Sequence, residues 1–231
     1  MDTLNVNIAK VFVDDKGEFG NPVGIVLNEN KQFSDEQKQQ VATKLNFSET
    51  VFIDSLEKTP IVSIFNPQHK VKFAGHAVLG TAYFIKHSLD KDIDSIKCWD
   101  ENVAARFEED KTYVTAPLSI MPAWNYEQLD STNQVERLSK EEITQKKHVF
   151  VWAWIDEIKG LIRARTFAPD WGIPEDQANG SGSILLATKL KKQIEILHGQ
   201  GSVIYARPIG SNLAEVGGLV KLGKKIELRN K

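Results

Sequence analysis

The 231-residue sequence contains a single cysteine, Cys98. One thiol forms no intrachain disulfide, and there is no cysteine pair to hold a metal ion or to run a two-thiol reaction. A chain without disulfides is typical of a reducing compartment. We therefore expect a cytoplasmic protein whose activity does not depend on thiol chemistry.

Neither sign of charge dominates, because 29 Lys and Arg residues face 31 Asp and Glu residues and the net charge is −2 at pH 7. Nucleic acid and anionic lipid are bound by strongly basic surfaces. The chain also lacks a basic and apolar leader, and no apolar run approaches the roughly 18 residues that span a bilayer. The composition thus argues against nucleic acid and membrane as partners.

An apolar segment, residues 77–85, follows directly on a turn that contains Gly75 and His76. Because this segment is apolar on every side, the pattern predicts a helix that is buried all round. The first turn of a helix carries unpaired N–H groups and the positive end of the helix dipole, and Gly75 would let a ligand approach them. The turn is therefore predicted to bind an anion such as a carboxylate.

The same arrangement, a strand followed by a glycine-containing turn and an apolar helix, occurs twice along the chain. Phe65 precedes Gly75 and its helix, while Phe167 precedes Gly180 and a second apolar helix at 184–190. The two phenylalanines are 102 positions apart and the two glycines 105, a little under half of the chain. The spacing indicates an internal duplication. Coincidence between two strand-to-helix connections is the alternative.

Short strands outnumber helices in the pattern, and most connections have the length of hairpin turns. Capping boxes at Ser34 and Ser139 predict two further helices. Asn21 and Pro22 are read as a turn between the first two strands, and residues 117–139 form the least periodic stretch. We place a boundary at the start of that stretch, which gives domains 1–116 and 117–231, with the last strand free to pair with the first domain.

Four segments, in this order, carry a resemblance to a known family. They are Gly20-Asn21-Pro22-Val23-Gly24-Ile25-Val26, Ser48-Glu49-Thr50-Val51-Phe52, Phe73-Ala74-Gly75-His76-Ala77 and Glu175-Asp176-Gln177-Ala178-Asn179-Gly180-Ser181. The chain resembles the PhzF-like isomerases of phenazine biosynthesis, whose fold is that of diaminopimelate epimerase. The resemblance implies an α+β protein of two pseudo-symmetric domains, each a barrel-like sheet wrapped around a central helix, with the active site in the cleft between them. It also implies a tendency to form homodimers.

Carried over to this chain, the resemblance implies a catalytic set and a substrate-binding set. The catalytic set is Glu49, His76, Asp176 and Ser181, and the substrate-binding set is Gly75, Ala77, Asn179, Gly180 and Gly182. Glu49 would both remove and return a proton on a small carboxylate-bearing substrate, without a cofactor. The related epimerases use two cysteines at the positions of Ala74 and Asn179. No metal site is predicted, because the other histidines lack ligand spacing.

Each nominated residue also has a plain structural interpretation. Alone, Glu49 is a solvated carboxylate at a strand end, His76 a core histidine, and Asp176 and Ser181 ordinary turn and cap residues. Their order as a set favours the functional interpretation. The chain departs from the family pattern ahead of Phe73, where Lys70 and Lys72 replace an acidic residue and a proline. The alternative to an isomerase is therefore a catalytically silent protein that binds a small acid in the same cleft.

Overall fold

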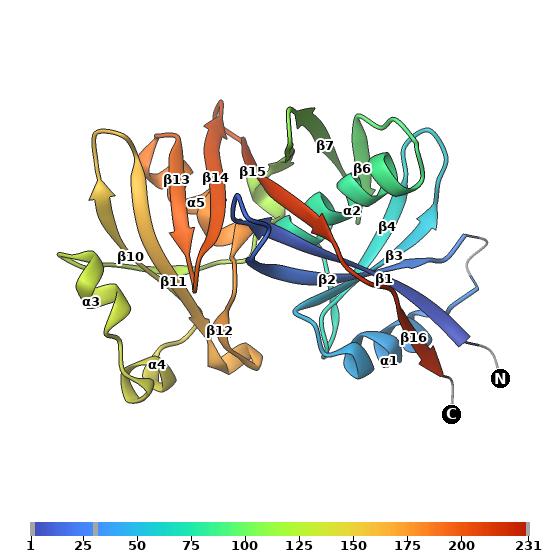
Figure 1. Ribbon diagram of the computed structural model, residues 1–231, viewed down its shortest axis with the longest axis horizontal. Coiled ribbons are helices and arrows are strands. Elements are labelled where there is room, and N and C mark those ends of the chain that lie inside the picture. The colour runs from blue at the N-terminus through green and yellow to red at the C-terminus, as the bar shows by residue number, and fades with distance from the viewer. Residues whose placement is uncertain (1–2, 30–31, 230–231) are drawn as a thin grey trace.

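The structure is a computed structural model that describes residues 3–29 and 32–229. It has two halves that lie side by side, and each half is a sheet curled around one buried helix (Figure 1). The helix is α2 (Gly75–Ser88) in the first half and α5 (Gly180–Leu190) in the second. The predicted α+β arrangement of two sheets around two helices is therefore confirmed.

The first half is a closed barrel of eight strands. Its further elements are β1 (Thr3–Val13), β2 (Phe19–Leu27), α1 (Asp35–Leu45), β3 (Glu49–Ser55), β4 (Ile61–Phe65), β5 (Lys70–Val71), β6 (Ser95–Cys98), β7 (Glu101–Glu108) and β8 (Lys111–Pro117). The strand order around the barrel is β1, β2, β3, β4, β6, β7, β8 and β15 (Leu213–Leu222), and β15 pairs back onto β1. The eighth strand of the first barrel thus comes from the C-terminal part of the chain, far in sequence from the other seven.

The second half continues the same sheet from β15 around α5. Its further elements are η1 (Leu118–Ile120), β9 (Asn125–Gln128), α3 (Thr132–Glu136), α4 (Lys140–Gln145), β10 (Val149–Asp156), β11 (Leu161–Ala168), η2 (Pro169–Trp171), β12 (Ile173–Asp176), β13 (Ile194–His198) and β14 (Ser202–Ile209). The strand order is β15, β14, β13, β11, β10 and β9. After β15 the chain ends in β16 (Ile226–Arg229), which pairs with β1.

The pairing pattern confirms the internal duplication. In each half a parallel pair encloses the first helical connection, β2 with β3 and β9 with β10, and a second parallel pair encloses the central helix, β4 with β6 and β11 with β13. The remaining steps of both halves are antiparallel. Phe65 and Phe167 occupy matching places at the ends of β4 and β11.

The position of α2 is set by close packing inside the barrel. Five of its apolar side chains have no exposed surface: Ala77, Val78, Leu79, Ala82 and Ile85. Burying a valine, leucine or isoleucine side chain contributes about 1.5–3 kcal/mol. A Cβ atom at Gly80 would lie 2.7 Å from a methyl of Val11 and 2.9 Å from one of Val23, so this glycine lets the helix approach β1 and β2. This packing holds the first turn of α2 at one mouth of the barrel.

One prediction about an individual segment is wrong. Asn21 and Pro22 do not form a turn but lie within β2, where Pro22 is opposite Lys10 of β1. The proline is tolerated because the pairing of β2 with β3 begins only at the next residue, Val23. The stretch 117–139, which lacks periodicity in the sequence, contains η1, β9 and α3. β9 has no apolar alternation, and it exists as a strand by pairing with β10.

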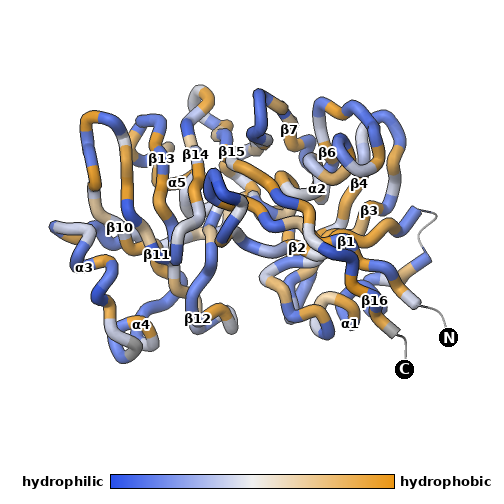
Figure 2. Tube along the Cα trace, viewed as in Figure 1, coloured by the Kyte–Doolittle hydropathy of each residue, from blue (hydrophilic) through white to orange (hydrophobic). Residues whose placement is uncertain are grey.

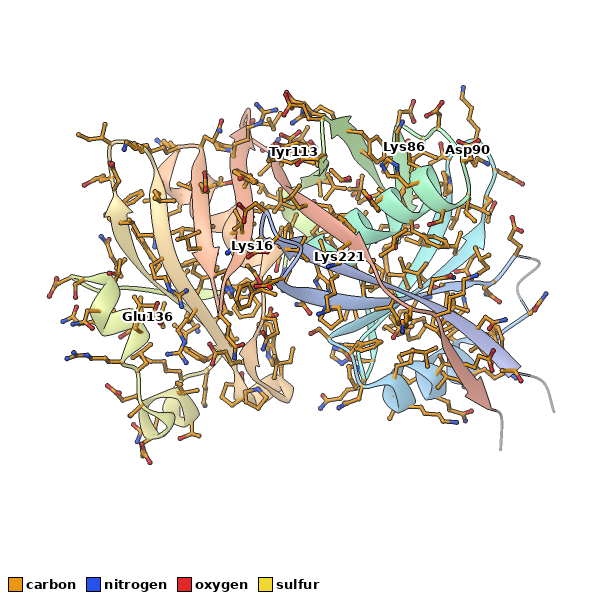
Figure 3. All side chains as sticks on the ribbon, in the orientation of Figure 1. Lys16, Lys86, Asp90, Tyr113, Glu136 and Lys221 are labelled. Atoms are coloured by element: carbon orange, nitrogen blue, oxygen red, sulfur yellow. The ribbon has the colours of Figure 1, made fainter. Side chains whose placement is uncertain are left out.

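The surface follows the expected division of polar and apolar residues. Figure 2 shows apolar stretches along the strands and hydrophilic turns between them. Both predicted capping boxes are present, at Ser34 of α1 and Ser139 of α4. Figure 3 labels Lys16, in the turn between β1 and β2, and Lys221 of β15 near the middle of the view, and Lys221 donates a hydrogen bond to the carbonyl of Gly17 in the same turn. Within the described part of the chain, no helix is long and apolar enough to cross a membrane.

Candidate active site

Glu49 and His76 form the centre of the candidate site. Glu49 is the first residue of β3, and His76 lies in the first turn of α2. His76 Nε2 and Glu49 Oε2 are 3.0 Å apart, and the side chains are only 6% and 16% exposed. Both atoms are buried, and neither is aligned for a hydrogen bond with a described residue. The pair is therefore close enough for a strong charge interaction and still has capacity for a ligand.

The charge state of His76 follows from its neighbours. Burial acts against the protonated ring, but the negative charges of Glu49 and Asp176 outweigh it and raise the pKa of His76 above its usual value. A protonated His76 would place one positive charge between two carboxylates. With His76 protonated, the net charge of these three side chains is closest to zero when one of the two carboxyl groups is neutral.

Asp176, the last residue of β12, faces this pair from the second half. Burial, the largest influence, raises the pKa of Asp176 to about 7, and the charge of Glu49 acts in the same direction. His76 and two hydrogen bonds oppose the rise: the Ala178 N–H donates to Asp176 Oδ1 over 3.3 Å, and Asn21 Nδ2 over 2.8 Å. Near neutral pH the Asp176 carboxyl is therefore shared between its protonated and ionised forms.

The first turn of α5 carries the remaining predicted residues. Asn179 caps the helix, and its Oδ1 accepts from the Gly182 N–H at 2.7 Å and from the Ser181 hydroxyl at 3.2 Å. Its Nδ2 is buried and has no partner among the described residues. α2 begins at Gly75 with no side-chain cap in the described chain. Both helix ends therefore offer N–H donors to a ligand.

A pocket of about 520 Å³ opens between the two halves at these helix ends. All four predicted catalytic residues line it, and so do three of the predicted substrate-binding residues: Gly75, Asn179 and Gly180. Ala77 and Gly182 do not. The Ala77 methyl is in the core of the first half, and a Cβ at Gly182 would lie 2.7 Å from the ring of Phe150.

An aromatic wall, which the sequence did not single out, completes the pocket. Trp124 and Trp171 meet edge to face with ring centroids 4.9 Å apart, and Trp124 Nε1 donates to Ser181 Oγ over 3.1 Å. His148 stacks on Trp171 at 4.8 Å and bonds Asp170 through Nδ1 at 2.8 Å. Trp124 precedes β9 in the stretch that lacks periodicity, and a tryptophan in such a stretch was the one available signal.

The two lysines that depart from the family pattern also line the pocket. Lys70 forms an ion pair of 3.0 Å with Asp35 of α1, and its Nζ lies 5.7 Å from the ring centroid of Trp99. Lys72 Nζ is 5.6 Å from the same centroid. Among residues 3–29 and 32–229, no group of three or more His, Cys, Asp and Glu side chains is arranged to hold a metal ion.

Known proteins resemble this chain in sequence and in fold. The family model described as phenazine biosynthesis-like protein, PhzC-PhzF, matches residues 9–152. The trans-2,3-dihydro-3-hydroxyanthranilate isomerase of Pseudomonas aeruginosa is 26% identical over 242 aligned positions, which span 83% of this chain and 86% of that protein.

Two solved structures show how far the fold likeness extends. A PhzF family protein of Enterococcus faecalis superposes with a TM-score of 0.80 at 19% identity, over 99% of this chain and all of its own. A hydroxyproline epimerase of Agrobacterium vitis, with bound trans-4-hydroxy-L-proline, has a TM-score of 0.63 at 11% identity, over 98% and 92% of the two chains. At these identities the likeness is one of fold.

Proposed function

This chain belongs to the phenazine biosynthesis-like protein family and is an isomerase, and we propose that it moves a proton on a small carboxylate-bearing metabolite. Glu49 is the proton carrier in this proposal, and no cofactor takes part. The observation that carries it is the 3.0 Å pair of Glu49 and His76, placed beside Asp176 at two converging helix ends. A carboxylate in such a place has the means to accept a proton from carbon.

The chemistry starts at a carbon next to a carboxylate or a double bond. Glu49 removes a proton from this carbon, the C–H bond breaks, and its electron pair stays in the substrate as delocalised negative charge. A proton then returns to a second carbon, or to the opposite face of the first. Atoms and electrons balance within the substrate, so the reaction needs no electron acceptor.

The helix ends and His76 are proposed to stabilise the charge that develops. The N–H groups of the first turns of α2 and α5 are fixed before the reaction, and fixed donors aimed at developing charge are the largest contribution in many enzymes. In this scheme Asp176, whose pKa burial raises to about 7, supplies a neutral carboxyl group that donates a hydrogen bond.

The test is a search for proton exchange rather than for one product. Wild-type protein is incubated in D2O with a panel of small carboxylates that includes trans-2,3-dihydro-3-hydroxyanthranilate, the compound named for the Pseudomonas aeruginosa relative. We expect loss of a carbon-bound proton signal by NMR, with isomerisation or racemisation of the same compound. Thermal stabilisation by a carboxylate without exchange or isomerisation would instead support the silent small-acid binder.

A further inference from the structure

Asn21 lies behind the pocket and connects the two carboxylate-bearing segments. It belongs to β2 of the first half and is 1% exposed. Its Oδ1 accepts a hydrogen bond of 3.3 Å from Ser48 Oγ, next to Glu49 in the chain. Its Nδ2 donates to Asp176 Oδ1 at 2.8 Å and to the carbonyl of Ala178 at 3.2 Å. One buried amide thus links the start of β3 to the end of β12.

These partners fix the orientation of the amide. The carbonyl of Ala178 accepts only, so the atom facing it and Asp176 is the nitrogen of Asn21, and the oxygen faces the Ser48 hydroxyl. With the amide reversed, Asn21 Oδ1 would face two other acceptors, Asp176 Oδ1 and the carbonyl of Ala178. Asn21 therefore presents a fixed N–H donor to one named oxygen of Asp176.

The two donors that reach Asp176 converge on the same oxygen. Asn21 Nδ2 and the backbone N–H of Ala178 both donate to Oδ1. An oxygen that accepts two hydrogen bonds is the poorer place for the proton of a neutral carboxyl group, so the proton of Asp176 belongs on Oδ2. Donation to the carboxylate also stabilises its ionised form against burial.

We propose that Asn21 is a positioning residue that holds Asp176 with Oδ1 as acceptor and Oδ2 as the proton-bearing oxygen. Asn21 does not line the pocket, so it acts on a substrate through the lining residues that it holds, which are Asp176, Ala178 and Ser48. This inference rests on the proposed proton transfer for its catalytic consequence, but the orientation of Asp176 can be tested without turnover. The titratable groups that act on Asp176 are His76 of α2 and Glu49 of β3.

The structure offers a matched control one residue away. The backbone N–H of Gly20 donates to Ser202 Oγ over 3.0 Å, which is a second buried hydrogen bond between β2 and the second half. In the described part of the chain Ser202 makes no hydrogen bond with Asp176, so Ser202→Ala removes a bond between the halves without changing a partner of the carboxyl group. The Asn21 and Ser202 variants separate the positioning of Asp176 from the joining of the halves.

The experiment follows the Asp176 carboxyl group by carbon-13 NMR, assigned with Asp176→Asn, in wild type, Asn21→Ala, Asn21→Asp and Ser202→Ala. We expect both Asn21 variants to raise the pKa of Asp176, in Asn21→Ala because a donor is lost and in Asn21→Asp because a second carboxyl group also takes its place, and Ser202→Ala to leave it unchanged. Asn21→Asp keeps the side-chain volume and serves if Asn21→Ala does not fold. An unchanged titration in the folded Asn21 variants would overturn the proposal, whether or not a substrate is known.

Turnover gives the second readout once a substrate is found. In Asn21→Ala we expect kcat to fall about tenfold with KM nearly constant, the size of one lost hydrogen bond. The limb of the pH–rate profile that requires protonated Asp176 should move to higher pH. Lower thermal stability with an unshifted pH profile would show a structural role and refute the positioning role. An inactive wild type would refute the proposed function and leave the NMR test standing.

Discussion

Gly75 and Gly180 face each other across the pseudo-symmetric centre of the molecule. A Cβ atom built on either glycine would lie 3.3 Å from the Cα of the other. The first turns of α2 and α5 are therefore in backbone contact, and the two helix ends reach one pocket because neither of these residues has a side chain.

Replacing Gly75 by Ala should damage ligand binding more than stability. The obstacle is backbone of α5, which must move by a few tenths of an ångström, while alanine favours a helix over glycine by up to about 1 kcal/mol. We expect a change in melting temperature of only a few degrees, but sulfate or citrate affinity, measured by calorimetry, and turnover should each fall roughly tenfold. Gly180→Ala should act alike, since the contact is reciprocal. Unchanged anion affinity in both variants would contradict the anion site.

Glu49→Gln should abolish most of the activity while the protein stays folded. Glutamine keeps the shape of the side chain but accepts no proton, so turnover should fall by roughly 10²- to 10⁴-fold with KM little changed. Exchange of substrate hydrogen with D2O should fall in parallel. Glu57→Gln is the control, because Glu57 is exposed just beyond the other end of β3. Wild-type turnover in Glu49→Gln would exclude Glu49 as the base.

Asp176→Asn should change how stability depends on pH. The carboxyl group titrates near 3.8 in the unfolded chain and near 7 in the fold. Since the fold favours the protonated form, the stabilisation is complete below the unfolded pKa and is lost as pH rises through about 7. His76, with its raised pKa, adds a loss in the same direction above 6.5. Asparagine stays neutral, so the variant should gain stability relative to wild type between about pH 4 and pH 8.

The measurement is the melting temperature of wild type and of Asp176→Asn between about pH 4 and pH 8. Asparagine keeps an oxygen that accepts from Asn21 and Ala178, so the comparison isolates the charge. Parallel curves for Asp176→Asn and wild type would mean that Asp176 titrates normally in the fold.

Replacing Cys98 should leave the activity of the protein unchanged. Burial raises the pKa of its thiol to about 12, and Sγ donates a hydrogen bond to the carbonyl of Lys72. The thiolate, which is the reactive form, is therefore scarce at neutral pH. We expect no alkylation by iodoacetamide until the protein is denatured, as followed by mass spectrometry, and wild-type turnover in Cys98→Ser. Loss of turnover in a folded Cys98→Ser variant would point to a role for the thiol.

The sequence was most informative where local pattern and long-range structure agree. The repeated strand, glycine and apolar helix around Phe65 and Phe167 predicted the duplication, because a helix without a polar face has to be enclosed. The order of the motifs predicted seven residues that line the pocket, although Ala77 and Gly182, which it also nominated, do not line it. The catalytic roles of Glu49 and His76 stay predictions, since geometry alone does not establish them.

What the sequence did not reveal depends on contacts between distant segments. β9 is a strand through its pairing with β10, and Trp124 belongs to the pocket through a hydrogen bond to Ser181, 57 positions away. The local sequence around Asn21 indicates a turn, whereas its partner Asp176 lies 155 positions along the chain. Neither propensity nor periodicity carries information on such pairs.

The shared strand β15 ties the folding of one half to the synthesis of the other. β15 pairs with β8 and β1 on the first barrel and with β14 on the second half. While the ribosome is still making the residues before Leu213, the edges of β1 and β8 have no partner, and exposed edges invite pairing with other chains. The barrel closes only through contacts between the ends of the chain, which form slowly because the intervening loop is long. A nascent chain that stops before β15 should therefore depend on chaperones to stay free of aggregates.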